Sequence, residues 1–372
     1  FFFKQKTAYE IKECDWSSDV CSSDLVFVTG VLGQDGANMV EYLINNTDHD
    51  IFGMVRRSSN PNFINCKSFL KNSRFKLVYG DLSDSVSIDS LVQEIQPDYF
   101  INFGAQSFVG CSWEIPLQTF DTNATGVARC LEAIRKHKPT CRFYSAGSSE
   151  EFGDVAYAPQ DISHPIRPRS PYGASKAAAR HIVKVYRESY NLYAVHGILF
   201  NHEGTKRGEE FVTRKITKGV ARIKKAIDNN KTFDPIELGN LDSKRDWSDS
   251  EDFIDGVWKM LNQEKPKDYV LSSNETHSIR EFIELAFKAA GIQGTWHGKG
   301  LSEEYSVTTE YAIKNDPNSS VLIKINPKFY RPAEVDLLLG NSYPAREELG
   351  WRPKTSFENL VNKMVEHDLL CS

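Results

Sequence analysis

Two residues of the stretch "SPYGASK" have the types and the spacing needed to oxidise an alcohol. Tyr172 and Lys176 are four positions apart, so on a helix both side chains lie on one face. A free phenol has a pKa of about 10, and a neighbouring ammonium together with an oxidised nicotinamide favours the phenolate. Tyr172 can then take the hydroxyl proton while hydride leaves the same carbon. The spacing also occurs by chance on amphipathic helices, so this interpretation depends on what surrounds it.

Earlier in the chain, "GSSEEFGD" adds two carboxylates for which a plain alcohol dehydrogenase has no use. After a sugar C4 hydroxyl becomes a ketone, the C5 hydrogen is acidic and the C6 hydroxyl is a β leaving group. A second acid/base group, with a pKa unlike that of the tyrosine, can then expel water. Glu150 is the candidate, with Ser148 on the same face of an extended segment. Glu151 faces the other way and is expected to be structural or solvated. The alternative for Glu150 is a surface carboxylate in a loop.

The elements that must position these groups begin with a glycine-rich turn. "LVFVTG" predicts a strand and "VLGQDGANMVEYLINN" a helix. Gly30, Gly33 and Gly36 stand at the junction, where glycine lets the backbone turn sharply and approach a pyrophosphate at the helix N-terminus. Three glycines alone are a weak signal, because turns use glycine freely. Their place at the first strand-to-helix turn favours a dinucleotide site, to which Gln34 and Asp35 also belong.

The end of the next strand distinguishes the two nicotinamide cofactors. An NAD site usually has Asp or Glu there for the ribose 2′-hydroxyl, whereas a 2′-phosphate requires arginine. Arg56 and Arg57 occupy these positions, and because guanidinium forks suit a phosphate dianion, NADP is favoured over NAD. The alternative is two solvated surface arginines. Later strand ends supply weaker cofactor candidates, namely Asp81, Leu82, Phe103, Gly104, Ala105, Gln106 and Ser107.

Strands and helices alternate through the first half of the chain. The strand runs include "DIFGMVRRSS", "FKLVYGDLSD", "DYFINFGAQS", "CRFYSAGSS" and "YAVHGILF", and long helical runs separate the last three. This rhythm predicts an α/β fold, a Rossmann-like doubly wound parallel sheet. After Asn201 the chain becomes polar, basic and mainly helical. We therefore expect a smaller C-terminal α/β substrate-binding lobe that closes over the carboxyl ends of the strands, where ligands of such sheets bind.

The expected organisation has three parts. Residues 1–25 lack strand or helix periodicity and the apolar run of a signal peptide, and "DWSSDVCSSDL" looks like a translated sequencing adapter, so we expect this segment to be non-native. Residues 26–202 are the predicted NADP-binding Rossmann domain. Residues 203–372 are predicted to form mainly the substrate-binding lobe, with some segments returning to the Rossmann domain.

Bulk composition excludes several classes of function. A net charge of -5 and a pI near 6.0 give no general attraction to nucleic acid or to an anionic membrane surface. No apolar run reaches the roughly 20 residues of a membrane span. The seven cysteines show neither metal-binding CxxC spacing nor a paired secretory framework, so we expect a reducing cytoplasm and no metal.

From Val26 to about Leu370 the chain resembles the GDP-mannose 4,6-dehydratases of the extended short-chain dehydrogenase/reductase group. The resemblance rests on "TGVLGQDG", "VRRSS", "GDLSD", "GAQS", "SSE", "RPRSPYGASK", "GILFNHE", "RGEEFVTRKIT", "GNLDSKRDW", "YRPAEVDLLLG" and "LGWRP". It implies that His202 and Arg207 contact NADP, and that GDP-mannose is held by Asn201, Val212, Lys215, Arg245 and Arg331. It also implies a homo-oligomer, a dimer or more typically a tetramer in which the "RRSS" loop reaches a neighbouring subunit, and the first step towards GDP-fucose and related deoxysugars.

Several positions depart from the family pattern. Ser148 stands where Thr is frequent, which keeps the hydroxyl, and Leu32 stands where Thr is usual. Phe108 replaces an expected His, and Ser248 an expected Gly. Gly204-Thr205-Lys206 replaces Ser-Pro-Arg. None of these changes removes a catalytic group, but together they leave the exact substrate preference open.

Two other functions are weighed against this one. The first is a 4,6-dehydratase or epimerase acting on another nucleotide sugar, against which "FVTRK" and "RPAEV" argue. The second is a non-catalytic NADP-binding sensor that kept the fold and lost the chemistry. The presence of Ser148, Glu150, Tyr172 and Lys176 argues against a sensor, which has no need of all four.

Overall fold

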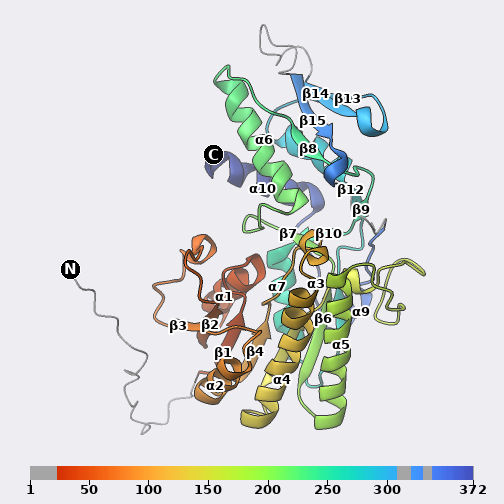
Figure 1. Cartoon of the computed structure of the whole chain (residues 1–372). Helices are drawn as coiled ribbons and strands as arrows, with labels where there is room; N and C mark the ends of the chain where they lie inside the picture. Colours follow the sequence, from red (N-terminus) through yellow and green to blue (C-terminus); the bar gives the residue numbers. More distant parts are fainter. Residues whose placement is uncertain (1–22, 308–319, 330–336, 372) are drawn as a thin grey trace, which may run out of the picture.

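The computed structural model describes residues 23–307, 320–329 and 337–371, and its main element is a seven-stranded parallel sheet (Figure 1). The strand order is β11-β6-β5-β4-β1-β2-β3. In that order the strands are Tyr269–Leu271, Ala194–Leu199, Arg142–Ala146, Tyr99–Asn102, Leu25–Thr29, Asp50–Val55 and Phe75–Tyr79. All six neighbouring pairs are parallel, so every carboxyl end lies at the same edge. The prediction of a doubly wound Rossmann-like sheet is confirmed.

Helices cover both faces of this sheet. On one face, Leu43 of α1 (Gln34–Asn46) and Val257 of α7 (Ser250–Leu261) belong to one apolar cluster with Val26 and Val28 of β1. On the other face, a second cluster joins Phe27 and Phe100 of the sheet to three helices, namely α2 (Ser85–Ile95), α4 (Gly126–His137) and α5 (Pro171–Tyr190). Because strand side chains alternate between faces, adjacent residues of β1 serve both clusters.

A second, smaller layer of strands and helices lies above the carboxyl edge of the main sheet in the view of Figure 1. Its four-stranded sheet has the order β13-β14-β15-β8. These strands are Gly294–His297, Glu304–Val307, Val321–Ile325 and Ile236–Leu238. They share an apolar cluster with α6 (Val212–Asp228), α8 (Ile279–Ala289) and α10 (Phe357–Cys371). We call this second layer the upper lobe.

Two short strand pairs lie between the two large sheets in the view of Figure 1. β7 (Asn201–Glu203) pairs with β10 (Trp247–Asp249) in parallel, and β9 (Lys244–Arg245) pairs with β12 (His277–Ser278) antiparallel. The remaining short helices are α3 (Pro116–Phe120), α9 (Tyr343–Glu348), a π-helical turn (Asp121–Thr125) and 3₁₀ turns at Ile64–Cys66, Gly110–Trp113, Ser149–Glu151, Gly300–Ser302 and Pro327–Phe329.

The structure differs from the sequence expectations in the region after β6. We expected residues 201–231 to be mainly helical, but β7 comes first and α6 begins only at Val212. The reason is that β7 pairs with a strand more than forty residues later, a long-range contact that local periodicity does not reveal. In the part of the chain that is described, no helix is long and apolar enough to cross a membrane.

Candidate active site

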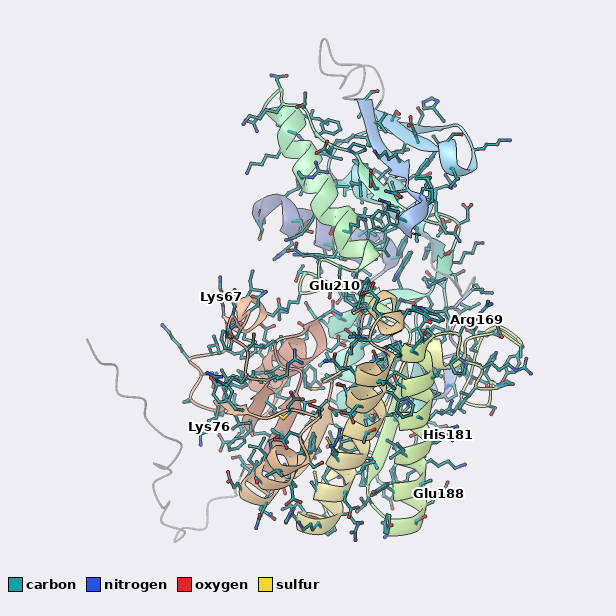
Figure 2. The ribbon with its side chains drawn as sticks, in the orientation of Figure 1. Lys67, Lys76, Arg169, His181, Glu188 and Glu210 are labelled. Atoms are coloured by element: carbon teal, nitrogen blue, oxygen red, sulfur yellow. The ribbon has the colours of Figure 1, made fainter. Side chains whose placement is uncertain are left out.

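A cavity of about 840 Å³ lies where the carboxyl edge of the main sheet meets the upper lobe. The main sheet contributes the ends of β4, β5 and β6, through Phe103, Ala146 and Leu199. The upper lobe contributes Lys215 of α6 and Leu238 of β8. Figure 2 shows the labelled Glu210, another lining residue, in the region between the two layers. The cavity therefore occupies the position at which open α/β sheets bind their ligands.

The Tyr172–Lys176 pair lies on the first turns of α5, facing this cavity. The helix begins here because Ser170 accepts the Gly173 N–H at 3.0 Å and Pro171 occupies the first helical position, where its missing N–H costs nothing. Both side chains are buried, and the Lys176 ammonium lies 5.8 Å from the centre of the Tyr172 ring. Lys176 Nζ also donates to the carbonyl of Ala146 at 2.7 Å. The two groups are thus brought together with little freedom to move.

Burial perturbs both titrating groups in the direction of neutrality. It raises the pKa of Tyr172 well above its usual value, and a hydrogen bond with the Ser148 hydroxyl and the charge of Arg207 only partly oppose this. Burial also lowers the pKa of Lys176 from 10.5 to about 8, against the charges of Glu151 and Asp35. In the protein alone the phenol is therefore protonated at neutral pH, and a further positive charge in the cavity would be needed to ionise it.

Glu150 is placed in the cavity by a capped 3₁₀ turn. Ser148 is the N-cap of this turn, and its hydroxyl accepts the Glu150 N–H at 3.2 Å. Our expectation of an extended segment is wrong here, because the serine and the acidic residue three positions on form a capping box that favours a helical turn. The turn still brings Ser148 and Glu150 to the same cavity as Tyr172. The alternative of Glu150 as a surface loop carboxylate does not fit this position.

Glu151 has a different environment from its neighbour. Its side chain is fully buried, accepts the Ser148 N–H at 2.8 Å and lies 2.9 Å from Nε2 of His196, which is also fully buried. A solvated Glu151, one of the two possibilities considered above, is therefore excluded. Gly147 makes room for this pair, since a Cβ there would lie 2.3 Å from the His196 ring. Glu151 consequently fixes the backbone that carries Ser148 and Glu150.

The glycine-rich turn has a geometry that excludes side chains. Gly30 has a φ of +72°, and a Cβ on it would lie 2.8 Å from the backbone of Gly104. A Cβ on Gly36 would lie 2.3 Å from the carbonyl oxygen of Gly30. Gly33 is the N-cap of α1. The backbone can approach this closely only with glycine at positions 30 and 36, and this close approach brings β1 directly into the N-terminus of α1, where an anion can bind.

Asp35 and His202 join α1 to β7 at the wall of the cavity. Asp35 Oδ2 lies 3.0 Å from His202 Nε2, and Gln34 donates to the His202 carbonyl at 3.1 Å. Burial alone would raise the pKa of Asp35, but His202 and Arg207 hold it below its usual value. Burial would likewise lower the pKa of His202, and Asp35 more than offsets this. Arg207 pairs with Glu203 at 3.0 Å on the same wall.

The other cofactor candidates fall into three groups. Of the residues after β4, the cavity is lined by Phe103, Ala105 and Ser107. Other candidates have partners within the protein: Asp81 accepts the Ser83 N–H at 2.9 Å, and Gln106 donates to the Phe108 carbonyl at 3.1 Å. Leu82 and Gly104 pack against each other, and neither lines the cavity.

Arg56 and Arg57 follow β2 directly and are both exposed. They do not line the cavity. The two residues stand at the end of β2, the strand that pairs with β1. The geometry that the 2′-phosphate argument needs, an arginine at the end of the second strand, is therefore present.

Four of the five predicted substrate residues line the cavity, namely Asn201, Val212, Lys215 and Arg245. Arg331 lies outside the described residues. Burial lowers the pKa of Lys215, whose ammonium lies 3.5 Å from the centre of the Phe329 ring. The predicted cations thus reach the cavity from α6 and β9.

Sequence reasoning missed an aromatic component of the cavity. Phe211 stacks under the Arg207 guanidinium, with 3.5 Å between Cζ and the ring centre. Its ring also meets that of Phe108 edge-on, with the centres 5.9 Å apart. The motif "GEEFVTRK" contains Phe211, but nothing in the spacing marks one phenylalanine as a lining residue. Among the described residues, no group of three or more His, Cys, Asp or Glu side chains could hold a metal ion.

A doubly wound sheet with a glycine-rich first turn, a buried Tyr-Lys pair and a strand-end serine defines a dinucleotide-dependent enzyme of the short-chain dehydrogenase/reductase type. Comparison with known proteins refines this class. The family model of GDP-mannose 4,6 dehydratase matches residues 27–364. The chain belongs to the GDP-mannose 4,6-dehydratase family.

Curated relatives agree with this family. The chain is 42% identical over 353 residues to GDP-mannose 4,6 dehydratase of Drosophila melanogaster, covering 93% of this chain and 86% of the relative. It is 38% identical over 358 residues to the Homo sapiens protein of the same name, covering 93% and 91% of the two chains. The similarity therefore extends through both layers of the structure.

Solved structures with the same fold are more distant in sequence. The structure of dTDP-glucose 4,6-dehydratase from Bacillus anthracis in complex with NAD superimposes with a TM-score of 0.73 at 20% identity, covering 93% of this chain and 96% of that chain. UDP-glucose 4-epimerase from Thermus thermophilus, also complexed with NAD, gives 0.74 at 23% identity, with 92% and 98% covered. At these identities the likeness concerns the fold.

Proposed function

We propose that this protein is a hydro-lyase that converts GDP-mannose to GDP-4-dehydro-6-deoxy-mannose and water, using tightly bound NADP. The observation that carries the proposal is the meeting of Glu150 with the Ser148–Tyr172–Lys176 group in one cavity of a chain that belongs to this family. A dehydrogenase needs only Ser148, Tyr172 and Lys176. The carboxylate adds the acid/base function that an elimination requires.

The residues present fit a nicotinamide dinucleotide. The glycine turn packs so closely that a Cβ on Gly30 or Gly36 would clash with backbone atoms, α1 begins directly after the turn, and two exposed arginines follow β2. Gly30, Gly33, Gly36, Gln34 and Asp35 would hold the pyrophosphate side. Arg56 and Arg57 would bind a 2′-phosphate, which favours NADP over NAD. When bound, the nicotinamide accepts hydride from the sugar C4 and returns hydride to C6.

The protein side chains would perform the proton transfers. Tyr172, ionised with the help of Lys176 and the oxidised ring, takes the C4 hydroxyl proton, while Ser148 orients that hydroxyl through its hydrogen bond with Tyr172. Glu150 removes the proton from C5 and delivers it to the departing C6 hydroxyl, which leaves as water. C5 then takes up one proton, which balances the proton that Tyr172 took from the C4 hydroxyl, and this completes the product. Hydride taken from C4 is returned to C6, so water is the only by-product.

The substrate would lie across both layers of the structure. Lys215 and Arg245 supply positive charge for the diphosphate, with Asn201 and Val212 beside them in the cavity. We assign Arg331, outside the described residues, the same role. Charge on these side chains would offset the overall net charge of -5 where an anionic substrate binds. The proposal also includes the remaining expectations. These are an NADP-binding domain at 26–202, a substrate-binding lobe at 203–372, a homo-oligomer and a cytoplasmic location.

The direct test is incubation of the purified protein with GDP-mannose and NADP, followed by mass measurement of the nucleotide-sugar product. Loss of one water is the expected result. Parallel reactions with dTDP-, CDP- and UDP-hexoses address the alternative substrates, and Tyr172→Phe serves as the inactive control. Turnover of another nucleotide sugar but not of GDP-mannose contradicts the proposal. NADP binding without any turnover favours the sensor instead.

A further inference from the structure

Residues 202–207, which we call the wall segment, supply three polar lining residues of the cavity, His202, Glu203 and Arg207. β7 ends at Glu203, and the chain from 204 to 211 forms turns and irregular backbone rather than helix or strand. In this irregular part, the Arg207 N–H donates a backbone hydrogen bond to the Gly204 carbonyl at 3.2 Å. His202 and Glu203 are held by the pairing of β7 with β10, so side-chain contacts must do much to hold residues 204–207 in place.

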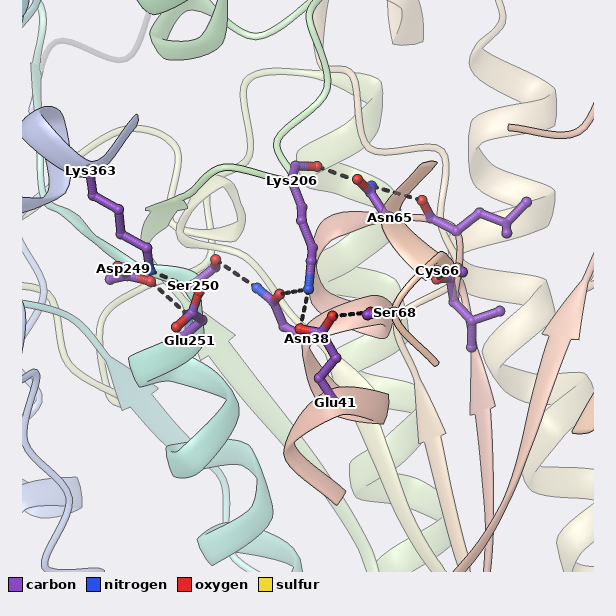
Figure 3. Close-up of polar contacts among 12 residues, drawn as sticks. Asn38, Glu41, Asn65, Cys66, Ser68, Lys206, Asp249, Ser250, Glu251 and Lys363 are labelled. Carbon is purple, nitrogen blue, oxygen red and sulfur yellow. Dashed lines mark hydrogen bonds and ion pairs between the residues drawn. The ribbon is translucent and has the colours of Figure 1, made fainter. Parts of the chain in front are cut away.

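One lysine attaches the wall segment to α1. Lys206 Nζ donates to Asn38 Oδ1 at 2.9 Å and pairs with the carboxylate of Glu41 (Figure 3). The lysine side chain is 18% exposed and the glutamate side chain 34%, so the pair is more than half shielded from water. Residues 34, 38 and 41 of α1 lie on one face by their spacing. Gln34 uses the same face to hold the His202 carbonyl.

A second contact ties the same residue to the glycine turn. Nδ2 of Asn65 donates to the Lys206 carbonyl at 3.2 Å and to the Leu32 carbonyl at 3.1 Å (Figure 3). Asn65 belongs to the chain that follows Arg56 and Arg57 after β2. Lys206 is thus the point at which the wall segment, the glycine turn and the segment after the arginine pair meet. The glycine turn and the wall segment contain residues assigned above to the cofactor, and the third segment directly follows the arginine pair.

The wall segment also lies against α7. Asn38, which accepts from Lys206, donates to Ser250 Oγ at 2.9 Å. A Cβ on Gly204 would lie 2.7 Å from the same Oγ, so glycine permits this close approach. The departure Gly204-Thr205-Lys206 noted in the sequence therefore has a structural meaning, because glycine lets the segment approach α7 and lysine reaches α1.

We propose that Lys206 is a positioning residue that locks the wall segment onto α1 and so keeps the dinucleotide bound between the two hydride transfers. This inference rests on the proposed function, in which hydride taken from C4 must return to C6 of the same sugar. Loss of the reduced cofactor between the transfers would leave the keto intermediate without its hydride donor. A lock on the cavity wall slows that loss.

The test measures release of NADPH from the full-length protein, by diluting the complex into excess NADP and following the fall in NADPH fluorescence. Lys206→Met removes the ammonium and keeps the length of the side chain, and we expect release to accelerate about tenfold, which corresponds to about 1.4 kcal/mol. Lys206→Arg keeps the charge and should release NADPH close to the parent rate. Lys224→Met is the matched control, because Lys224 also pairs with a carboxylate, Asp228, but on the exposed face of α6.

Two further variants separate a lock from a general loss of stability. Glu41→Gln should accelerate release as Lys206→Met does, and the double variant should be no faster than the faster single variant, because both changes break one pair. Asn65→Ala removes the hydrogen bond from Asn65 to the Lys206 carbonyl and should also accelerate release. Parent-like release from Lys206→Met, or equal acceleration in Lys224→Met, overturns the inference while leaving turnover of GDP-mannose by the parent intact. A parent that binds no NADPH overturns the proposed function as well.

Discussion

Alanine at Gly36 and alanine at Gly33 should damage the glycine-rich turn in different ways. A Cβ on Gly36 would lie 2.3 Å from the Gly30 carbonyl oxygen and 2.8 Å from Cα of Val31. Both atoms are backbone, so neither can rotate out of the way. A Cβ on Gly33 would meet the same oxygen at 3.3 Å, and the residue has an ordinary φ of -82°. Gly36→Ala must therefore displace a strand or a helix, whereas Gly33→Ala fits with a small adjustment.

The expected magnitudes follow from two opposing terms. Alanine in a helix is favoured over glycine by about 1 kcal/mol, while overpacking a close contact costs about 1–3 kcal/mol, and a clash with backbone falls at the upper end. The net loss for Gly36→Ala is about 2 kcal/mol of unfolding free energy. For Gly33→Ala the less favourable N-cap costs about 0.5 kcal/mol or less. The methyl group would nevertheless stand where a pyrophosphate approaches the backbone.

Chemical denaturation without cofactor and titration with NADPH separate the two effects. Gly36→Ala should lower the denaturation midpoint clearly. Gly33→Ala should keep a midpoint close to the parent's and bind NADPH about tenfold more weakly or worse. A Gly36→Ala protein as stable as the parent would refute the packing argument. Parent-like NADPH affinity in Gly33→Ala would refute the assignment of this turn to the pyrophosphate.

Three other predictions address charges. Replacing both Arg56 and Arg57 by alanine should weaken NADPH binding at least tenfold and leave NADH binding nearly unchanged, since only the 2′-phosphate differs; a parent that prefers NADH in the same titration is the contrary result. The pKa of Lys176 is lowered to about 8 from 10.5, so between these pH values the folded protein holds fewer protons than the unfolded chain and stability should rise with pH. Lys176→Met should reduce that rise and should lose turnover. Its unfolding free energy at pH 7 should increase by about 1–2 kcal/mol, because a buried charge is removed. Denaturation at pH 7 and pH 9.5 measures both effects on stability. His196→Ala should cost about 3 kcal/mol, because it leaves the buried Glu151 carboxyl without its ring partner, and an unfolding free energy within 1 kcal/mol of the parent's would contradict this.

Much of the fold was predictable because the strands and helices of the main sheet carry local signals. β1 is an apolar run followed by Gly30, and α5 begins at Pro171, directly after its N-cap Ser170. The carboxyl ends of parallel strands share one edge, so the glycine turn and the Tyr172 helix were expected to meet there. Chemistry-bearing residues at strand ends were thus visible from the sequence.

Other features depend on contacts between distant parts of the chain. The pairing of Glu151 with His196 joins the turn after β5 to β6. Nothing in the stretch "SSEEFG" indicates that its second glutamate has a buried histidine partner. The link from Lys206 to Glu41 spans 165 positions. The 3₁₀ turn at Ser148 was missed for another reason, since its capping box was visible but was interpreted as the end of a strand.

The central claim is that Glu150 performs the elimination and Tyr172 the redox step. The measurement that tests it most directly follows NADPH absorbance and C5 proton exchange in deuterated water during reaction of GDP-mannose with two variants. Glu150→Gln should still form NADPH, but C5 exchange should fail and product release should fall at least about a hundredfold. Tyr172→Phe should form no NADPH at all. Release of the 4-keto-6-deoxy product by Glu150→Gln at the parent rate would contradict the account.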